Sequence, residues 1–208
     1  NLQEYEHAPS AFSSIKAHAA RDANPRARLF AACLETLLPG SPRQQFKAAA
    51  AVGANWLKRS PSDPYAHWLV GRNAQRLGEH ASAQRHLQIA VSLLPREAQP
   101  RVALASSLVK HGELRAAAAL VRPLLNRNPK HALANVLLGQ IRFSRGESDW
   151  EQALGQMVFG CEQYVSDARR HEGLSRVADR LGEIRTRAPE LVARTAARLV
   201  ELLAPQVP

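Results

Sequence analysis

The sequence predicts an all-α protein, a right-handed α-solenoid of antiparallel helix pairs stacked one on the next. Two ladders of residues share a single period of 34 residues. Their members are Pro61, Pro95 and Pro129 in the first and Gly78, Gly112 and Gly146 in the second. Within each period the glycine separates two helical stretches and the proline closes the second, which is the pattern of a repeated helix–turn–helix. The composition is that of a folded chain, with 45% apolar residues, and no apolar run approaches the ~20 residues of a membrane-spanning helix.

Each element of the repeat has a physical reason at its ends. Gly78 and Gly112 suit the position just after a helix, where the backbone turns left-handed. Pro95 cannot continue a helix and therefore ends one. Asp63 supplies a capping side chain ahead of Pro64, which suits the first position of a helix. A single helix pair cannot bury its apolar face, so several pairs are expected to stack around a continuous core.

The small and large positions within one period resemble those of the tetratricopeptide repeat (TPR), a 34-residue helix–turn–helix. The first repeat carries this signature at His67, Val70, Gly71, Ala74, Ala83, Leu87 and Pro95, and the second at Arg101, Leu104, Ala105, Leu108, Ala117, Val121 and Pro129. The third carries it at Asn135, Leu138, Gly139 and Arg142, and continues at Ala153 and Met157 if the segment 146–150 holds two extra residues. Small Gly71 and Ala83 are expected to let two helices approach closely, while Leu87 fills the space between neighbours.

The resemblance divides the chain into four predicted segments. They are an N-terminal capping segment at 1–23, a degenerate repeat at 24–62, three TPR-like repeats at 63–165, and a C-terminal helix pair or cap at 166–208. An apolar stripe at Phe12, Ile15 and Ala19 predicts a short helix that covers the first repeat. The closing pair is predicted at about 167–187 and 189–204. Its last helix is apolar on more than one side, at Leu199, Val200, Leu202 and Leu203, which predicts self-association or contact with a further domain.

The net charge of +10 is concentrated in the middle of the chain. Residues 43–145 hold 16 basic and 4 acidic side chains, whereas residues 1–42 are neutral overall and residues 146–208 carry a net charge of −2. A basic surface of this size attracts acidic partners and speeds their encounter at low salt. Aromatic residues make up only 5% of the chain, which argues against a nucleic-acid strand stacked along the surface.

In the TPR family the first helix of each repeat lines a concave groove, which implies a candidate binding groove here. In the first repeat, Tyr65, Trp68, Arg72 and Arg76 share one helical face. The corresponding positions are Gln99, Val102, Ser106 and Lys110 in the second repeat and Leu133, Val136, Gln140 and Ser144 in the third, with Phe143 beside the last. Arg96 and Lys130 are predicted at the groove rim. The slots of the family's carboxylate clamp hold Trp68, Arg72 and Ala103 instead of its lysine and asparagine, so chaperone-tail binding of that type is not expected.

No residue pattern predicts a catalytic, metal or cofactor site. The segment that starts at His171 begins like a zinc-protease motif, but Ser175 stands where the second histidine ligand belongs. Cys33 and Cys161 both lie in apolar segments and are expected to be buried free thiols. His67 is expected to be an ordinary surface histidine with its hydrogen bonds satisfied.

The sequence therefore favours a non-catalytic interaction or scaffold module whose basic groove binds an acidic protein or peptide within a larger assembly. Two alternatives stay open. One is a guide for an anionic polysaccharide in a bacterial envelope secretion or synthesis machine, and the other is the repeat domain of a larger transferase. No secretion signal is visible, but the chain begins at Asn1, so a preceding segment stays an open alternative. The compartment also stays open between the bacterial cytoplasm and the periplasm.

Overall fold

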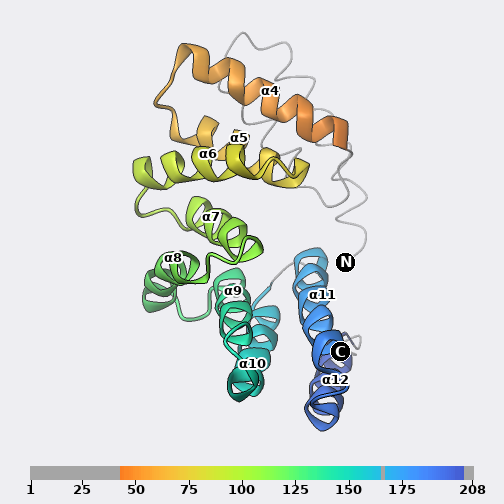
Figure 1. Cartoon of the computed structure of the whole chain (residues 1–208). Coiled ribbons are helices and arrows are strands. Elements are labelled where there is room, and N and C mark those ends of the chain that lie inside the picture. Colours follow the sequence, from red (N-terminus) through yellow and green to blue (C-terminus); the bar gives the residue numbers. More distant parts are fainter. Residues whose placement is uncertain (1–42, 165–166, 204–208) are drawn as a thin grey trace, which may run out of the picture. The chain divides into compact units, whose positions relative to one another are not determined.

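The computed structural model describes residues 43–164 and 167–203, and every regular element in these ranges is helical. Figure 1 shows the elements, which are α4 (Arg43–Arg59), α5 (Pro64–Leu77), α6 (His80–Leu93), α7 (Ala98–Lys110), α8 (Leu114–Arg127), α9 (Ala132–Phe143), the 3-10 turn η1 (Glu147–Asp149), α10 (Trp150–Glu162), α11 (Asp167–Ile184) and α12 (Pro189–Leu203). The predicted all-α class is confirmed over this part of the chain. The chain divides into two compact units, Asn1–Pro100 and Arg101–Pro208. The predicted N-terminal cap, its apolar stripe and Cys33 lie outside the described residues.

In the first unit, α5 contacts both α4 and α6. The hairpin of α5 and α6 requires a glycine, because a Cβ on Gly71 would lie 2.8 Å from Leu87 Cγ and 3.1 Å from the carbonyl oxygen of Ala83. The predicted close approach between Gly71 and Ala83 is therefore confirmed. Gly53 of α4 is similarly confined, since its Cβ would lie 2.7 Å from Val70 Cγ2. Both interfaces of α5 depend on small residues that let helix backbones approach.

The two ends of α5 are fixed by Asp63 and Gly78. The Oδ1 atom of Asp63 accepts hydrogen bonds from the backbone N–H groups of Tyr65 and Ala66, at 2.9 and 3.1 Å. Its Oδ2 atom accepts a third from Trp56 Nε1, at 2.8 Å. Gly78 closes the helix with a φ of 82°. Asp63 is therefore the predicted helix cap, and it also ties the start of α5 to the last turns of α4.

In the second unit, α9 contacts α8, α10 and α11. The packing of α9 on α10 requires glycines at two levels. A Cβ on Gly139 would lie 2.7 Å from the carbonyl oxygen of Ala153, and one on Gly160 would lie 2.7 Å from a backbone carbonyl oxygen of α9. The turn η1 absorbs the extra residues predicted between α9 and α10, so that Ala153 and Met157 face Gly139 as the repeat pattern requires.

Two features of α7 and α8 depart from a simple amphipathic pattern. Residues 102–108 of α7 are all buried, including Ser106 and Ser107. This segment is made of small and apolar residues on every side, so it has no wide polar face to turn toward water. In α8, Pro123 stands inside the helix on its exposed side, where water can compensate the lost backbone hydrogen bond.

The helices α11 and α12 form the closing pair near the ranges that the sequence predicts. Ile184 and Leu199 enter the same core as α10, with Leu202 packed against it. Val200 and Leu203 remain 67% and 51% exposed, so α12 carries apolar side chains outside its buried stripe. Within the described residues no helix combines the length and the hydropathy needed to cross a membrane.

Candidate binding surface

The candidate surface lies on α5, where Tyr65, Trp68, Arg72 and Arg76 follow one another along one side of the helix. We call these four residues the α5 face. Tyr65 is 55% exposed and Arg76 is exposed, while Trp68 and Arg72 are half-buried. Because α5 is packed against α4 and α6, the spacing of the four side chains is set by helix geometry and held by a rigid element.

Both arginines of the α5 face lie over aromatic rings. Arg72 Cζ lies 5.9 Å from the centroid of the Trp68 ring, and Arg76 Cζ lies 4.9 Å from that of Phe46, which belongs to α4. Cation–π contacts contribute about 0.5–1 kcal/mol at exposed sites. These contacts restrict the rotamers of two long side chains, and each arginine also interacts with other groups of the chain. The two guanidinium groups are therefore held near fixed positions.

The charge of the segment that carries the α5 face is strongly positive. Residues 43–145 hold 16 basic and 4 acidic side chains, so their own acidic groups cannot neutralise most of the basic ones. The C-terminal part differs in its charge balance, because residues 146–208 hold 8 basic and 10 acidic side chains, and five arginines there pair with glutamates. These pairs are Arg176–Glu172, Arg180–Glu183, Arg187–Glu147, Arg194–Glu151 and Arg198–Glu162. The excess positive charge belongs to the segment from α4 to α9, where it favours anionic groups.

The predicted groove positions of the second repeat are less open than those of α5. Val102 and Ser106 are buried, whereas Lys110 at the end of α7 is exposed. Arg96 and Lys130, predicted at the rim, are exposed in the connections before α7 and α9. Lys110 belongs to the second unit and the α5 face to the first. The groove positions of the second repeat therefore do not form the predicted continuous stripe, because the buried Val102 and Ser106 separate the exposed Gln99 and Lys110.

Phe143, predicted beside the groove of the third repeat, lies in the core. Its ring is 5% exposed and stacks on Trp150, with the ring centroids 5.6 Å apart. Its assignment to an open surface is therefore corrected. The physical reason is that Trp150 starts α10 directly after η1, where the insertion brings a second large ring against Phe143.

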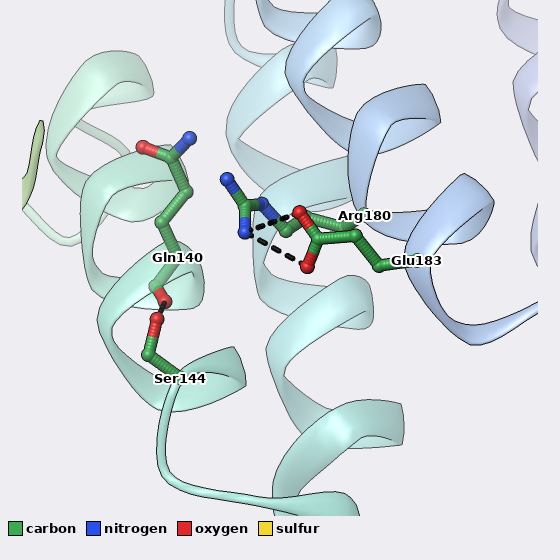
Figure 2. A network of polar contacts seen from close by, with 4 residues as sticks. All are labelled: Gln140, Ser144, Arg180 and Glu183. Atoms are coloured by element: carbon green, nitrogen blue, oxygen red, sulfur yellow. Dashed lines mark hydrogen bonds and ion pairs between the residues drawn. The ribbon is translucent and has the colours of Figure 1, made fainter.

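Gln140 and Ser144 of the third repeat lie at a polar cluster near α9 and α11, whereas Val136 is fully buried in the hydrophobic core. Figure 2 shows the side chains of Gln140 and Arg180 extending toward each other from these two helices. Arg180 pairs with Glu183 at 2.7 Å, and the Ser144 hydroxyl donates to the backbone carbonyl of Gln140 at 3.1 Å. Arg180, which lies over the Phe143 ring of α9, already has its charge matched by Glu183, so this end of the predicted groove is less basic than α5.

His67 and His86 form a hydrogen-bonded pair between α5 and α6. Their Nδ1 atoms are 2.9 Å apart, and His67 Nε2 lies 2.9 Å from the carbonyl oxygen of Pro61. A carbonyl only accepts, so we assign the proton of His67 to Nε2, which leaves His86 Nδ1–H to donate to His67 Nδ1. The expectation of a surface histidine is wrong, because His67 is only 7% exposed. Its partner stands 19 positions away on the next helix, where the local pattern could not show it.

Acid is expected to destabilise the fold through two histidines with lowered pKa values. Burial, the neighbouring His67 and then Arg85 lower the pKa of His86 below its usual value of 6.5. Burial also lowers the pKa of His131, whose Nδ1 caps α9 by accepting from the N–H of Ala134, although a backbone hydrogen bond acts in the opposite direction. Below pH 6.5 the unfolded chain takes up these protons more readily than the folded chain. The stability present above that pH is therefore lost as the pH falls through the folded-state pKa values.

Urea denaturation at about pH 7.5 and about pH 5.5 measures this loss. The variant His86→Gln keeps a donor for His67 but does not titrate, so it should lose less stability on acidification than the wild type. His171→Gln changes an exposed histidine and should keep the wild-type pH dependence. If both variants follow the wild type, His86 does not contribute to the acid sensitivity.

Across residues 43–164 and 167–203, no group of three or more His, Cys, Asp or Glu side chains could hold a metal ion. Cys161 is buried, as expected, and burial raises the pKa of its thiol to about 11. Its nucleophilic thiolate form is scarce at neutral pH, so Cys161 serves as a core residue.

Comparison with known proteins gives matches among solved structures. The crystal structure of MamA matches with a TM-score of 0.55 and 18% sequence identity, over 77% of this chain and 92% of that chain. A MamA RS-1 ArsTM double mutant matches with a TM-score of 0.56 and 18% identity, over 77% and 86% of the two chains. The thermophilic TPR protein TTC0263 of Thermus thermophilus is 21% identical, with a TM-score of 0.47 over 76% and 92%. No protein-family model and no curated protein matches the sequence.

The two MamA matches show the fold of the chain. The architecture is all-α and TPR-like. This follows from the helix pairs in the described residues, from their glycine contacts and from the likeness to these structures. The resemblance read from the 34-residue period is confirmed at the level of the fold.

Proposed function

We propose that the chain is a non-catalytic interaction module that binds an acidic segment of a protein partner through the α5 face. One observation carries the proposal: the guanidinium groups of Arg72 and Arg76 are held over aromatic rings along one side of α5. The TPR-like fold supports a scaffold role of this general kind. The positive charge of the surrounding segment favours a partner that carries negative charge.

The chemistry of the α5 face suits carboxylates flanked by apolar groups. A guanidinium can form two parallel hydrogen bonds with one carboxylate. Trp68 and Tyr65 add aromatic surface beside the charges, and Trp, Tyr and Arg are the residues that most often dominate binding energy at interfaces. The excess of basic residues over residues 43–145 speeds the approach of acidic partners and disfavours basic ones.

Reversing both charges tests this proposal. The double variant Arg72→Glu/Arg76→Glu should weaken binding of an acidic peptide roughly tenfold or more while leaving helix content unchanged, and wild-type affinity should fall as salt rises. Isothermal titration calorimetry and circular dichroism measure the two effects. Lys58→Glu/Arg85→Glu is the matched control, because it makes the same change in net charge at exposed positions of the same unit.

The control should keep most of the affinity. An equal loss in both double variants would mean that net charge alone binds the peptide, and unchanged affinity in Arg72→Glu/Arg76→Glu would exclude the α5 face. An anionic polysaccharide and a nucleic-acid strand are titrated in parallel. Tighter binding of either one, with the same sensitivity to the Arg72 and Arg76 reversal, would reassign the partner class.

A further inference from the structure

We infer that the α5 face selects an extended segment in which two carboxylates lie two residues apart and an apolar side chain lies two residues beyond the carboxylate that meets Arg72. The inference rests on the proposed function and adds the spacing of the groups that the partner presents. Its basis is the match between the rise of a helix and the repeat of an extended chain.

The two arginines set the first spacing. Arg72 and Arg76 are four residues apart on α5, and a rise of 1.5 Å per residue puts their backbones about 6 Å apart along the helix axis. In an extended chain, residues i and i+2 point to the same side and lie about 6.6–6.8 Å apart. Two acidic residues separated by one other residue therefore match the backbone spacing of the two arginines. Directly adjacent acidic residues point to opposite sides and do not match.

The two aromatic residues set the third position. Trp68 lies about 12 Å and Tyr65 about 16 Å from Arg76 along the helix axis. The third residue on the same side of an extended chain lies about 13 Å from the first, and so falls between the two rings. These distances join backbone positions along the helix axis, while the guanidinium groups themselves lie over Trp68 (Arg72) and over Phe46 of α4 (Arg76). An apolar side chain at this position would cover exposed surface of Tyr65 and the partly exposed Trp68.

The aromatic contacts orient the arginines for this task. Arg72 rests on Trp68 of its own helix, and Arg76 rests on Phe46 of α4. An aromatic ring over one face of a guanidinium leaves its N–H edges available for a carboxylate in the same plane. Since both arginines also interact with other groups of the chain, binding exchanges one set of contacts for another. The selectivity per carboxylate is therefore expected to be a few-fold.

A helical ligand could present acidic residues at a similar distance, since residues four apart on a helix are also separated by about 6 Å. A short free peptide must first nucleate a helix, which is unfavourable for so few residues. Extended conformations are already common in unfolded chains. The α5 face therefore selects the two-residue spacing from short segments, and the four-residue spacing becomes the decisive comparison.

Four labelled peptides of equal composition and charge test the inference by fluorescence anisotropy with the full chain. The first has the order acidic–x–acidic–x–leucine, the second has adjacent acidic residues, and the third has acidic residues four apart. The fourth keeps the first acidic pair but places the leucine directly after it, so that the leucine points to the opposite side of the extended chain. The first peptide should bind roughly three- to tenfold more tightly than the others. Tyr65→Ala should remove the preference for the leucine position and keep the preference for the acidic spacing.

Each result decides a separate point. Equal binding of all four peptides, still lost in Arg72→Glu/Arg76→Glu, would overturn the inferred spacing and leave the proposed function in place. Tightest binding of the third peptide would overturn the extended ligand in favour of a helical one. If no acidic peptide binds, the proposed function falls and the inference falls with it.

Discussion

Replacing Gly139 with leucine is expected to destabilise the packing of α9 on α10 by about 3 kcal/mol or more. Even a single Cβ at this position would lie 2.7 Å from the carbonyl oxygen of Ala153 and 3.0 Å from the backbone nitrogen of Met157, and it would also overlap Met157 Cγ. Two of these three atoms belong to the backbone of α10 and cannot move out of the way by changing a rotamer. The helices must separate, and the fully buried Met157 would then lose part of its packing.

Gly155 provides a matched control on α10. A Cβ there would meet no atom within 4 Å, so Gly155→Ala should stabilise the protein by about 0.5–1 kcal/mol through helix propensity alone. Urea denaturation followed by circular dichroism measures both variants. If Gly139→Leu were as stable as Gly155→Ala, the helix pair could not be as closely packed as these distances indicate.

The helix pairs could be predicted from the sequence because their causes are local and repeated. Gly78 requires a left-handed backbone at the end of α5, and Pro95 cannot continue α6, wherever these helices pack. Gly71 and Gly139 hold equivalent places in two hairpins, so one pattern of small residues fixed the contact in both. The third hairpin keeps this register because the insertion lies in η1, in the connection between α9 and α10 and not in either packed helix.

The partners that α5 side chains contact on neighbouring helices could not be predicted from the sequence of α5 alone. Phe46 lies in the repeat with a degenerate signature, so nothing in the sequence placed its ring against Arg76. His86 meets His67 only across the α5–α6 hairpin.

In α7, the spacing of Val102 and Ser106 correctly places them along one side of a helix, but this spacing does not predict whether that side is buried. A helix of small residues can pack on every side, and both are buried.

Replacing Trp150 with alanine is expected to cost about 3–5 kcal/mol and to loosen α11 from α9 and α10. The ring is 7% exposed and stacks on Phe143 at 5.6 Å, with 19° between the ring planes. Two arginines of the segment that follows α10 lie over this pair. Arg187 Cζ is 5.2 Å from the Trp150 ring centroid, and Arg180 Cζ is 5.7 Å from that of Phe143. Removing Trp150 therefore creates a cavity and also removes the ring beneath Arg187.

Hydrogen exchange distinguishes the contribution of the buried Trp150 ring from that of the exposed Arg187 charge. In Trp150→Ala, the amides of α11 should exchange faster than those of α9, because α9 and α10 pack extensively on each other while α11 packs less on both. Arg187→Met is the matched control. It removes an ion pair with Glu147 in which both side chains are more than half exposed, and this should cost less than about 1 kcal/mol. Trp150→Phe keeps a ring for Phe143 and Arg187 and should lie between these two variants. If Trp150→Ala were no less stable than Arg187→Met, the aromatic pair would not anchor α11, and the buried aliphatic side chains of α10 and α11 would have to hold the closing helices without it.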